Sequence, residues 1–112
     1  MMGVVTRRVV RQKLLQAAVL DKIEREHLPV NTARVREKVQ NIRRHVTGKS
    51  LHRCLDEWER IVDDNDIEAV RAVVESDDEH AREMRNLSPL SILLSETERL
   101  QVLDILRSSW SE

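Results

Sequence analysis

The scarcity of turn-forming residues constrains this fold more than any other feature of the sequence. The chain has two glycines and two prolines among 112 residues, whereas a β-rich domain needs a turn roughly every eight to twelve residues. Phe and Tyr are absent, so Leu, Val, Ile and Ala must supply most of the core. A chain of this length forms one domain with a modest core. We therefore predict an all-α fold.

Helical periodicity locates two helices in the first part of the chain. The first is expected over about residues 5–27, ended by Pro29. A short second helix is expected over residues 32–39, capped by Asn31 or Thr32. The apolar residues expected to face inward are Val10, Leu14, Ala17, Ala18 and Ile23 in the first helix, and Val35, Val39 and Ile42 in or just after the second.

A third helix, after a turn at residues 43–48, has the clearest pattern in the sequence. Its apolar residues are spaced by three and four, which is typical of an amphipathic helix. They are Leu51, Cys54, Leu55, Trp58, Ile61 and Val62. We expect Trp58 to anchor this helix on the first two, and Cys54 to be a small core residue.

The remaining residues predict a second set of short helices. Asp66 is a candidate cap for one helix, Asp77 or Asp78 for the next, and Ser95 with Glu98 forms a capping box for the last. The last helix carries Leu100, Leu103, Leu106 and Trp110 along one side. The segment SPLSILL, residues 88–94, is apolar for a connection, and both a core role and a subunit contact are open.

Charge divides the chain into two unlike halves. Residues 1–53 contain thirteen Lys and Arg against four Asp and Glu, a net charge of +9. Residues 54–112 contain six Arg against sixteen Asp and Glu, a net charge of −10. A basic half attracts a polyanion such as nucleic acid. The alternative is that the two halves pair with each other or with a second subunit.

The basic half has the order of elements of a helix-turn-helix, in which the last helix enters the major groove of DNA. We expect residues 1–62 to form this DNA-binding region, with a recognition helix at about 49–62, and residues 63–112 to form a small acidic helical subdomain. Gly48 supplies the turn, and Thr47 or Ser50 caps the helix. The residues expected to contact DNA are Arg34, Lys38, Arg43, Arg44, His45, Lys49, Ser50, His52 and Arg53.

Catalytic and cofactor sites find little support in the sequence. Gly48-Lys49-Ser50 ends many phosphate-binding loops, but such a loop needs a glycine where this chain has Arg43, and an apolar strand before it. The four histidines are scattered, and His52 and Cys54 diverge on a helix by about 200°. We predict a non-enzymatic protein without cofactor or metal.

Several short motifs within about residues 15–60 resemble the N-terminal DNA-binding segment of the KfrA family of plasmid regulators. These motifs are Pro29 with Thr32, Val35-Arg36, Gly48-Lys49-Ser50 and Leu55-Asp56-Glu57-Trp58. The resemblance implies sequence-specific binding to DNA.

We therefore expect a small transcriptional regulator that binds double-stranded DNA as a homodimer. The second interpretation is an adaptor or antitoxin-like protein whose acidic half binds a partner protein. An RNA-binding module is disfavoured because few aromatic residues exist to stack on bases. No apolar run reaches the roughly 18 residues of a membrane span, and the first residues lack the apolar stretch of a signal peptide. A cytoplasmic location is expected.

Overall fold

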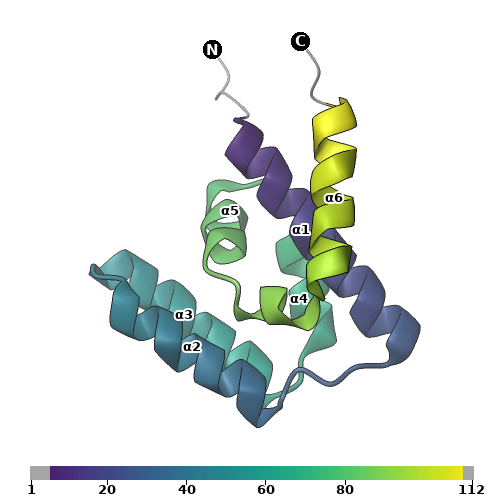
Figure 1. The fold of residues 1–112 in the computed structure, drawn as a ribbon. Coiled ribbons are helices and arrows are strands. Elements are labelled where there is room, and N and C mark those ends of the chain that lie inside the picture. The colour runs from purple at the N-terminus through teal and green to yellow at the C-terminus, as the bar shows by residue number, and fades with distance from the viewer. Residues whose placement is uncertain (1–5, 110–112) are drawn as a thin grey trace.

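The computed structural model describes residues 6–109, and within this range all regular secondary structure is helical. The helices are α1 (Arg7–Glu26), α2 (Ala33–His45), α3 (Lys49–Asp63), α4 (Ile67–Glu75), α5 (Glu79–Asn86), the 3-10 helix η1 (Pro89–Leu93) and α6 (Glu96–Ser109), shown in Figure 1. The prediction of an all-α fold is confirmed. No helix among the described residues is long and apolar enough to cross a membrane.

Local capping explains where several helices begin and end. The side chains of Thr32, Asp66 and Asp78 accept the backbone N–H three residues ahead, as expected from the sequence. Ser95 and Glu98 form the predicted capping box, because each side chain accepts the backbone N–H of the other residue. Helix α1 ends at His27, which adopts a left-handed conformation (φ 54°), so the chain leaves the helix before it reaches Pro29.

Helices α2 and α3 lie side by side as an antiparallel hairpin (Figure 1). Near the turn, Arg43 forms ion pairs with Asp56 at 3.0 Å and Glu59 at 2.8 Å. At the other end of the hairpin, Arg36 pairs with Asp63 at 3.0 Å. Contact therefore extends along both helices. The crossing of a helix-turn-helix is not confirmed, and α2 continues through residues 43–45, the first half of the expected turn, so that residues 46–48 form the connection.

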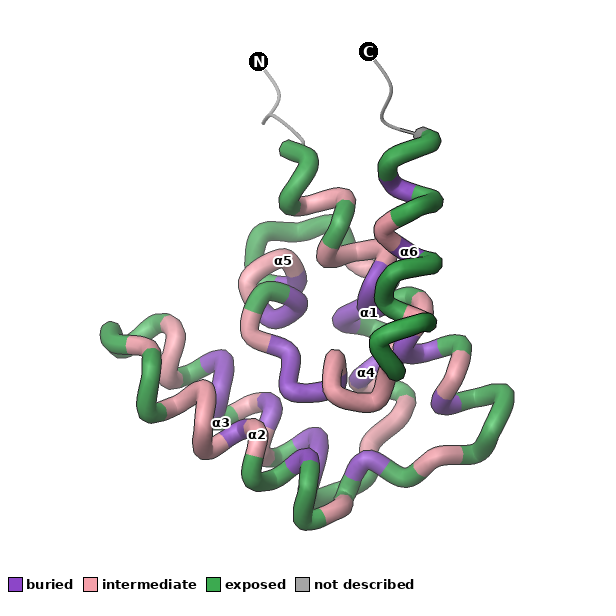
Figure 2. Tube along the Cα trace, in the orientation of Figure 1, coloured by how far each residue is buried: buried purple, intermediate pink, exposed green. Residues whose placement is uncertain are grey.

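One hydrophobic core joins the two halves of the sequence. Its residues come from α1 to α5 and η1, and they include Val19, Val39, Trp58, Val74 and Leu90. Figure 2 shows the buried segments meeting where these elements face each other. Helix α1 packs against α4, α5, α6 and η1, so the predicted ranges 1–62 and 63–112 share this core.

The face of α1 that enters the core differs in part from the predicted one, although Ile23 is buried as expected. Its buried residues are Leu15, Gln16, Val19, Leu20 and Ile23. Ala17 is exposed, which corrects the expectation that it faces inward, whereas Val10, Leu14 and Ala18 are half-buried. Helices α4, α5, α6 and η1 all pack against α1. The buried residues of α1 therefore do not follow the single apolar stripe expected from the sequence.

The apolar segment 88–94 is part of the core. Leu90 of η1 is fully buried, and Ile92, Leu93 and Leu94 pack against the same cluster. The core interpretation of this segment is thus confirmed. In α6, Val102 and Leu106 are buried. Leu100 is 49% exposed and does not share their side, in contrast to the prediction, and Trp110 lies outside the described residues.

Two buried polar side chains fix α5 to its neighbours. Trp58 of α3 is completely buried, as predicted, and its indole Nε1–H donates to the Met84 carbonyl at 2.8 Å. The guanidinium of Arg85, itself 1% exposed, donates to the carbonyls of Val73 at 2.7 Å and Ser76 at 2.6 Å. Arg85 thereby satisfies carbonyls at the end of α4 that have no partner within the helix.

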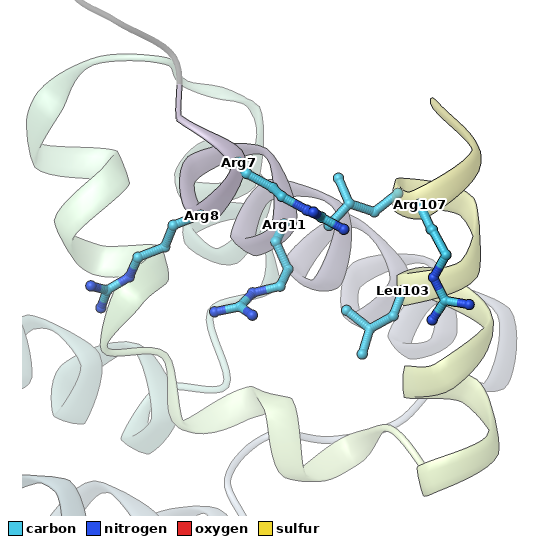
Figure 3. A pocket seen from close by; sticks show the side chains of 6 residues that line it. Arg7, Arg8, Arg11, Leu103 and Arg107 are labelled. Atoms are coloured by element: carbon cyan, nitrogen blue, oxygen red, sulfur yellow. The ribbon is translucent and has the colours of Figure 1, made fainter. Parts of the chain in front are cut away.

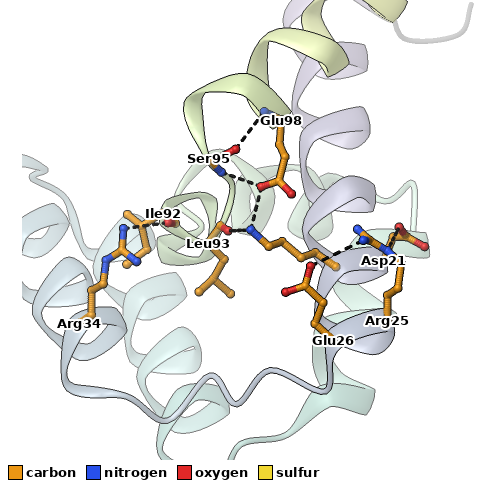
Figure 4. A network of polar contacts seen from close by, with 9 residues as sticks. Asp21, Arg25, Glu26, Arg34, Ile92, Leu93, Ser95 and Glu98 are labelled. Atoms are coloured by element: carbon orange, nitrogen blue, oxygen red, sulfur yellow. Dashed lines mark hydrogen bonds and ion pairs between the residues drawn. The ribbon is translucent and has the colours of Figure 1, made fainter.

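A polar network ties α1 to η1 and α6 (Figure 4). Lys22 donates to the Leu93 carbonyl at 2.8 Å and pairs with Glu98 at 2.7 Å. The Lys22 hydrogen bond and the Ser95 backbone N–H lower the pKa of Glu98 to about 2. Beside this network, Arg34 of α2 donates to the Ile92 carbonyl at 3.1 Å.

Candidate nucleic-acid interface

The closed end of the α2–α3 hairpin carries most of the predicted DNA contacts. We call residues 44–53 the hairpin tip. Gly48 at its centre has φ 105°, a conformation that side chains other than glycine rarely adopt. Gly48 is also the N-cap of α3, and no side chain caps this helix. The prediction that Thr47 or Ser50 caps it was therefore wrong.

The tip has an uncompensated positive charge. Arg44, Lys49 and Arg53 are exposed, and none forms an ion pair with another residue in the range 6–109. Two of them lie in the first turns of α3, where the helix dipole already disfavours cations. The first turn of α3 contains no acid, whereas α4, α5 and α6 each begin with at least one. The tip therefore favours an anion.

Three other residues predicted to contact DNA already contact groups of the protein itself. Arg43 is 23% exposed, and its two ion pairs with α3 balance its charge. His52 is half-buried and places Nε2 3.0 Å from the Val46 carbonyl, across the turn. His45 places Nδ1 2.8 Å from the Asn41 carbonyl. His52 thus holds the turn, and His45 binds a carbonyl of the last turns of its own helix α2. Neither ring can extend into a groove without breaking its contact.

Lys38 and Arg34 belong to a different face of α2. Together with Arg44 they line a shallow depression of about 190 Å³ next to η1. Arg34 already donates to η1, and the acidic Glu37 lies in the same depression. Of the nine predicted residues, six belong to the hairpin tip and Arg34, Lys38 and Arg44 line this depression, so that Arg44 is common to both. Arg43 belongs to neither group.

Some basic residues of the first half form ion pairs with acidic residues of the second half. Besides Arg36 and Arg43, two lysines of α1 pair with acids of the other half: Lys13 with Asp77, and Lys22 with Glu98. Lys13 lowers the pKa of Asp77 below its usual range. The alternative that the halves pair with each other therefore accounts for some of the basic residues, but not for those of the tip.

A second basic surface lies at the start of α1 and was not among the predicted contacts. Arg7, Arg8 and Arg11 line a cavity of about 310 Å³ together with Arg107, Leu103 and Leu106 of α6 (Figure 3). The sequence shows the three α1 arginines but gives no sign that α6 approaches them. Arg107 also pairs with Asp104 at 3.4 Å.

Within residues 6–109, residues of metal-binding type also meet between α3 and α5. Cys54 of α3 lies beside His80 and Glu83 of α5. The sequence did not reveal this group, because His80 and Cys54 are far apart along the chain and only the packing of α5 on α3 brings them together.

These features define an all-α protein with an exposed basic helical hairpin. The chain matches no protein-family model, no curated protein and no solved structure.

Proposed function

We propose that this protein is a non-enzymatic regulator that binds duplex DNA through the hairpin tip. The observation that carries the proposal is the group of exposed donors at the start of α3, without an acid to compensate them. Arg44, Lys49, Ser50 and Arg53 are the residues assigned to DNA. The resemblance of residues 15–60 to the KfrA family agrees with this assignment. Contacts inside the hairpin hold the tip in place. Arg43 pairs with Asp56 and Glu59 of α3, His52 contacts the Val46 carbonyl, and His45 contacts the Asn41 carbonyl of α2.

Phosphate contact makes the affinity depend on salt in a calculable way. Each neutralised phosphate contributes about −0.9 to the slope of log affinity against log salt concentration. Contacts from Arg44, Lys49 and Arg53 therefore give a slope of about −3. The experiment is fluorescence anisotropy on a labelled random duplex at several salt concentrations. A slope near zero, or no binding at low salt, would exclude the tip as a phosphate-binding surface.

Charge removal at the tip has a matched control on the same hairpin. The double variant Lys49→Ala, Arg53→Ala should bind duplex DNA more weakly and reduce the slope by about two units. Arg36→Ala removes a cation that is already paired with Asp63, so its slope should equal that of the parent. Equal losses in both variants would indicate a response to net charge alone.

Base contacts and phosphate contacts differ in selectivity. On a random duplex Arg53 contacts phosphate, and at a cognate site we assign it to a base edge. Once such a site has been found by selection from random duplexes, Arg53→Ala should reduce the preference for it by about 1–3 kcal/mol. Arg44→Ala should instead weaken binding to all duplexes alike. If both variants bind cognate and scrambled duplex as the parent does, with helicity unchanged by circular dichroism, the tip does not bind DNA.

A second candidate function is that of an adaptor, for which α6 supplies the supporting observation. Leu100 is 49% and Ile105 57% exposed on this helix, with Asp104 between them. Exposed apolar side chains with acidic neighbours fit a partner protein that has a basic rim, or a second copy of this chain. In-cell crosslinking of the parent and an Ile105→Glu variant tests this candidate, which predicts that the crosslinked species is lost only in the variant.

A further inference from the structure

Helices α3 and α5 bring three different metal-ligand types to one place. The ligand atoms of Cys54, His80 and Glu83 all lie within 4.8 Å of one another. The Cys54 thiol lies 3.9 Å from Glu83 Oε1. A tetrahedral site with ordinary zinc bond lengths separates sulfur and oxygen ligands by about 3.5 Å. The three side chains are therefore close to the spacing that one ion requires.

The two helices present these residues with matching periodicity. Cys54 and Glu57 are three residues apart on α3, and His80 and Glu83 are three residues apart on α5. Residues with this spacing share a helix face. Trp58, in the next turn of α3, donates to the Met84 carbonyl and fixes α3 against α5. The core thus holds the two faces in register without help from a ligand.

The fourth residue of this group is placed to hold the histidine. Glu57 Oε1 lies 2.8 Å from Nε2 of His80. A metal-bound histidine commonly donates its other ring N–H to a carboxylate, which orients the ring and increases its basicity. Glu57 does not belong to the set of ligand atoms within 4.8 Å, so we assign it to the imidazole rather than to the metal.

The electrostatics of the group favour a cation. Two carboxylates lie near the Cys54 thiol: Glu83 Oε1 is 3.9 Å from its sulfur, and Glu57 is three residues further along the same helix. No Lys or Arg pairs with Glu57 or Glu83 within residues 6–109. A divalent cation would compensate both acids and convert the thiol to the thiolate that binds metal.

We propose that Cys54, His80 and Glu83 bind one divalent cation of the zinc class, with Glu57 orienting His80. Thiolate with imidazole selects a borderline-soft ion over Mg²⁺ or Ca²⁺, which prefer oxygen ligands only. Three protein ligands leave one position for water. His80 is more than half exposed, so an ion can reach the site from solvent on the His80 side.

Cobalt substitution tests the thiolate contact directly. The reduced, metal-free full chain is titrated with CoCl₂ and then with ZnCl₂. We expect one equivalent of Co²⁺ to produce a thiolate-to-cobalt charge-transfer band, and Zn²⁺ to abolish it by displacement. Mg²⁺ should not displace the cobalt. Absence of the band, or its persistence after Zn²⁺ is added, would overturn the proposal.

Variants then locate the ion. His80→Ala and Glu83→Gln change residues outside the core and should each lower the zinc affinity by about tenfold or more. Glu79→Gln is the matched control, because Glu79 is an exposed acid one residue from His80 with no ion pair among the described residues. Its affinity should equal that of the parent. If His80→Ala binds Zn²⁺ as tightly as the parent, the ion lies elsewhere and the proposal is wrong.

Discussion

At the scale of single residues, Trp58 makes the most consequential contacts. It is the only large aromatic side chain in the described core, and it combines complete burial with a hydrogen bond to α5. Trp58→Ala should lower the free energy of unfolding by about 3–5 kcal/mol, because it leaves a cavity and removes the buried hydrogen bond to the Met84 carbonyl. Urea denaturation followed by circular dichroism measures this loss.

Trp58→Phe is the matched variant for this prediction. Phenylalanine keeps much of the apolar volume but removes the N–H donor, so the loss should be smaller, about 1–3 kcal/mol. A loss below about 1 kcal/mol for Trp58→Ala would show that the indole is not enclosed.

Local chemistry explains which residue-scale features the sequence revealed. The caps at Thr32, Asp66 and Asp78, and the apolar residues of α3, were predictable because each depends on neighbours within one or two turns. The left-handed His27 and the failure of Ser50 to cap α3 were not, because they depend on how the chain enters the next helix. The contact of Cys54 with His80 depends on tertiary packing alone.

At the scale of helices, the Lys22–Glu98 pair makes the junction of α1 and α6 sensitive to acid. The pKa of Glu98 falls from 4.5 to about 2 in the folded state. A lowered folded-state pKa stabilises the protein above the unfolded value, and this contribution is lost as the pH falls from 4.5 towards 2. Melting temperatures measured across this window should fall less steeply for Glu98→Gln than for the parent.

The control for this prediction is Glu96→Gln, in the first turn of the same helix. Glu96 takes no part in the Ser95–Glu98 capping box or in the pair with Lys22. Its melting temperatures should follow those of the parent throughout the window. Parallel curves for Glu98→Gln and the parent would contradict the assignment of this pH dependence to Glu98.

The hairpin shows why helix lengths are easier to predict than their arrangement. The charged run of residues 43–45 was interpreted as a turn, but the ion pairs of Arg43 with Asp56 and Glu59 stabilise it as the last turn of α2. Those partners belong to α3. A sequence pattern identifies the apolar side of each helix, whereas the angle between two helices depends on contacts across them.

At the scale of the whole molecule, the shared core makes the two halves interdependent. Val70, Val73, Met84 and Leu90 pack in the same cluster as the buried residues of α1, α2 and α3. A fragment of residues 1–62 should therefore show little helicity and no cooperative thermal transition, because its helices are marginal without packing. Circular dichroism of the fragment and the full chain in the same buffer makes the comparison. A cooperative transition in the fragment would contradict a single shared core.

The distribution of ion pairs over the whole molecule was the most difficult feature to predict. The charges of the two halves were evident from the sequence, but which cations pair internally was not. Lys13 and Lys22 balance acids across the fold, whereas Arg44, Lys49 and Arg53 remain exposed at the tip. Packing determines which charged residues form ion pairs, because such pairs form between residues that the core has brought close together.

The buried Arg85 couples the motions of α4 and α5. Its hydrogen bonds to the Val73 and Ser76 carbonyls join the end of α4 to the last turn of α5. A fluctuation that opens either helix must expose this charge or break those bonds, so neither opens at low free energy alone. We therefore expect the backbone amides of both helices to exchange as one cooperative unit, whereas the hairpin tip, built mostly from exposed residues, should exchange through smaller openings.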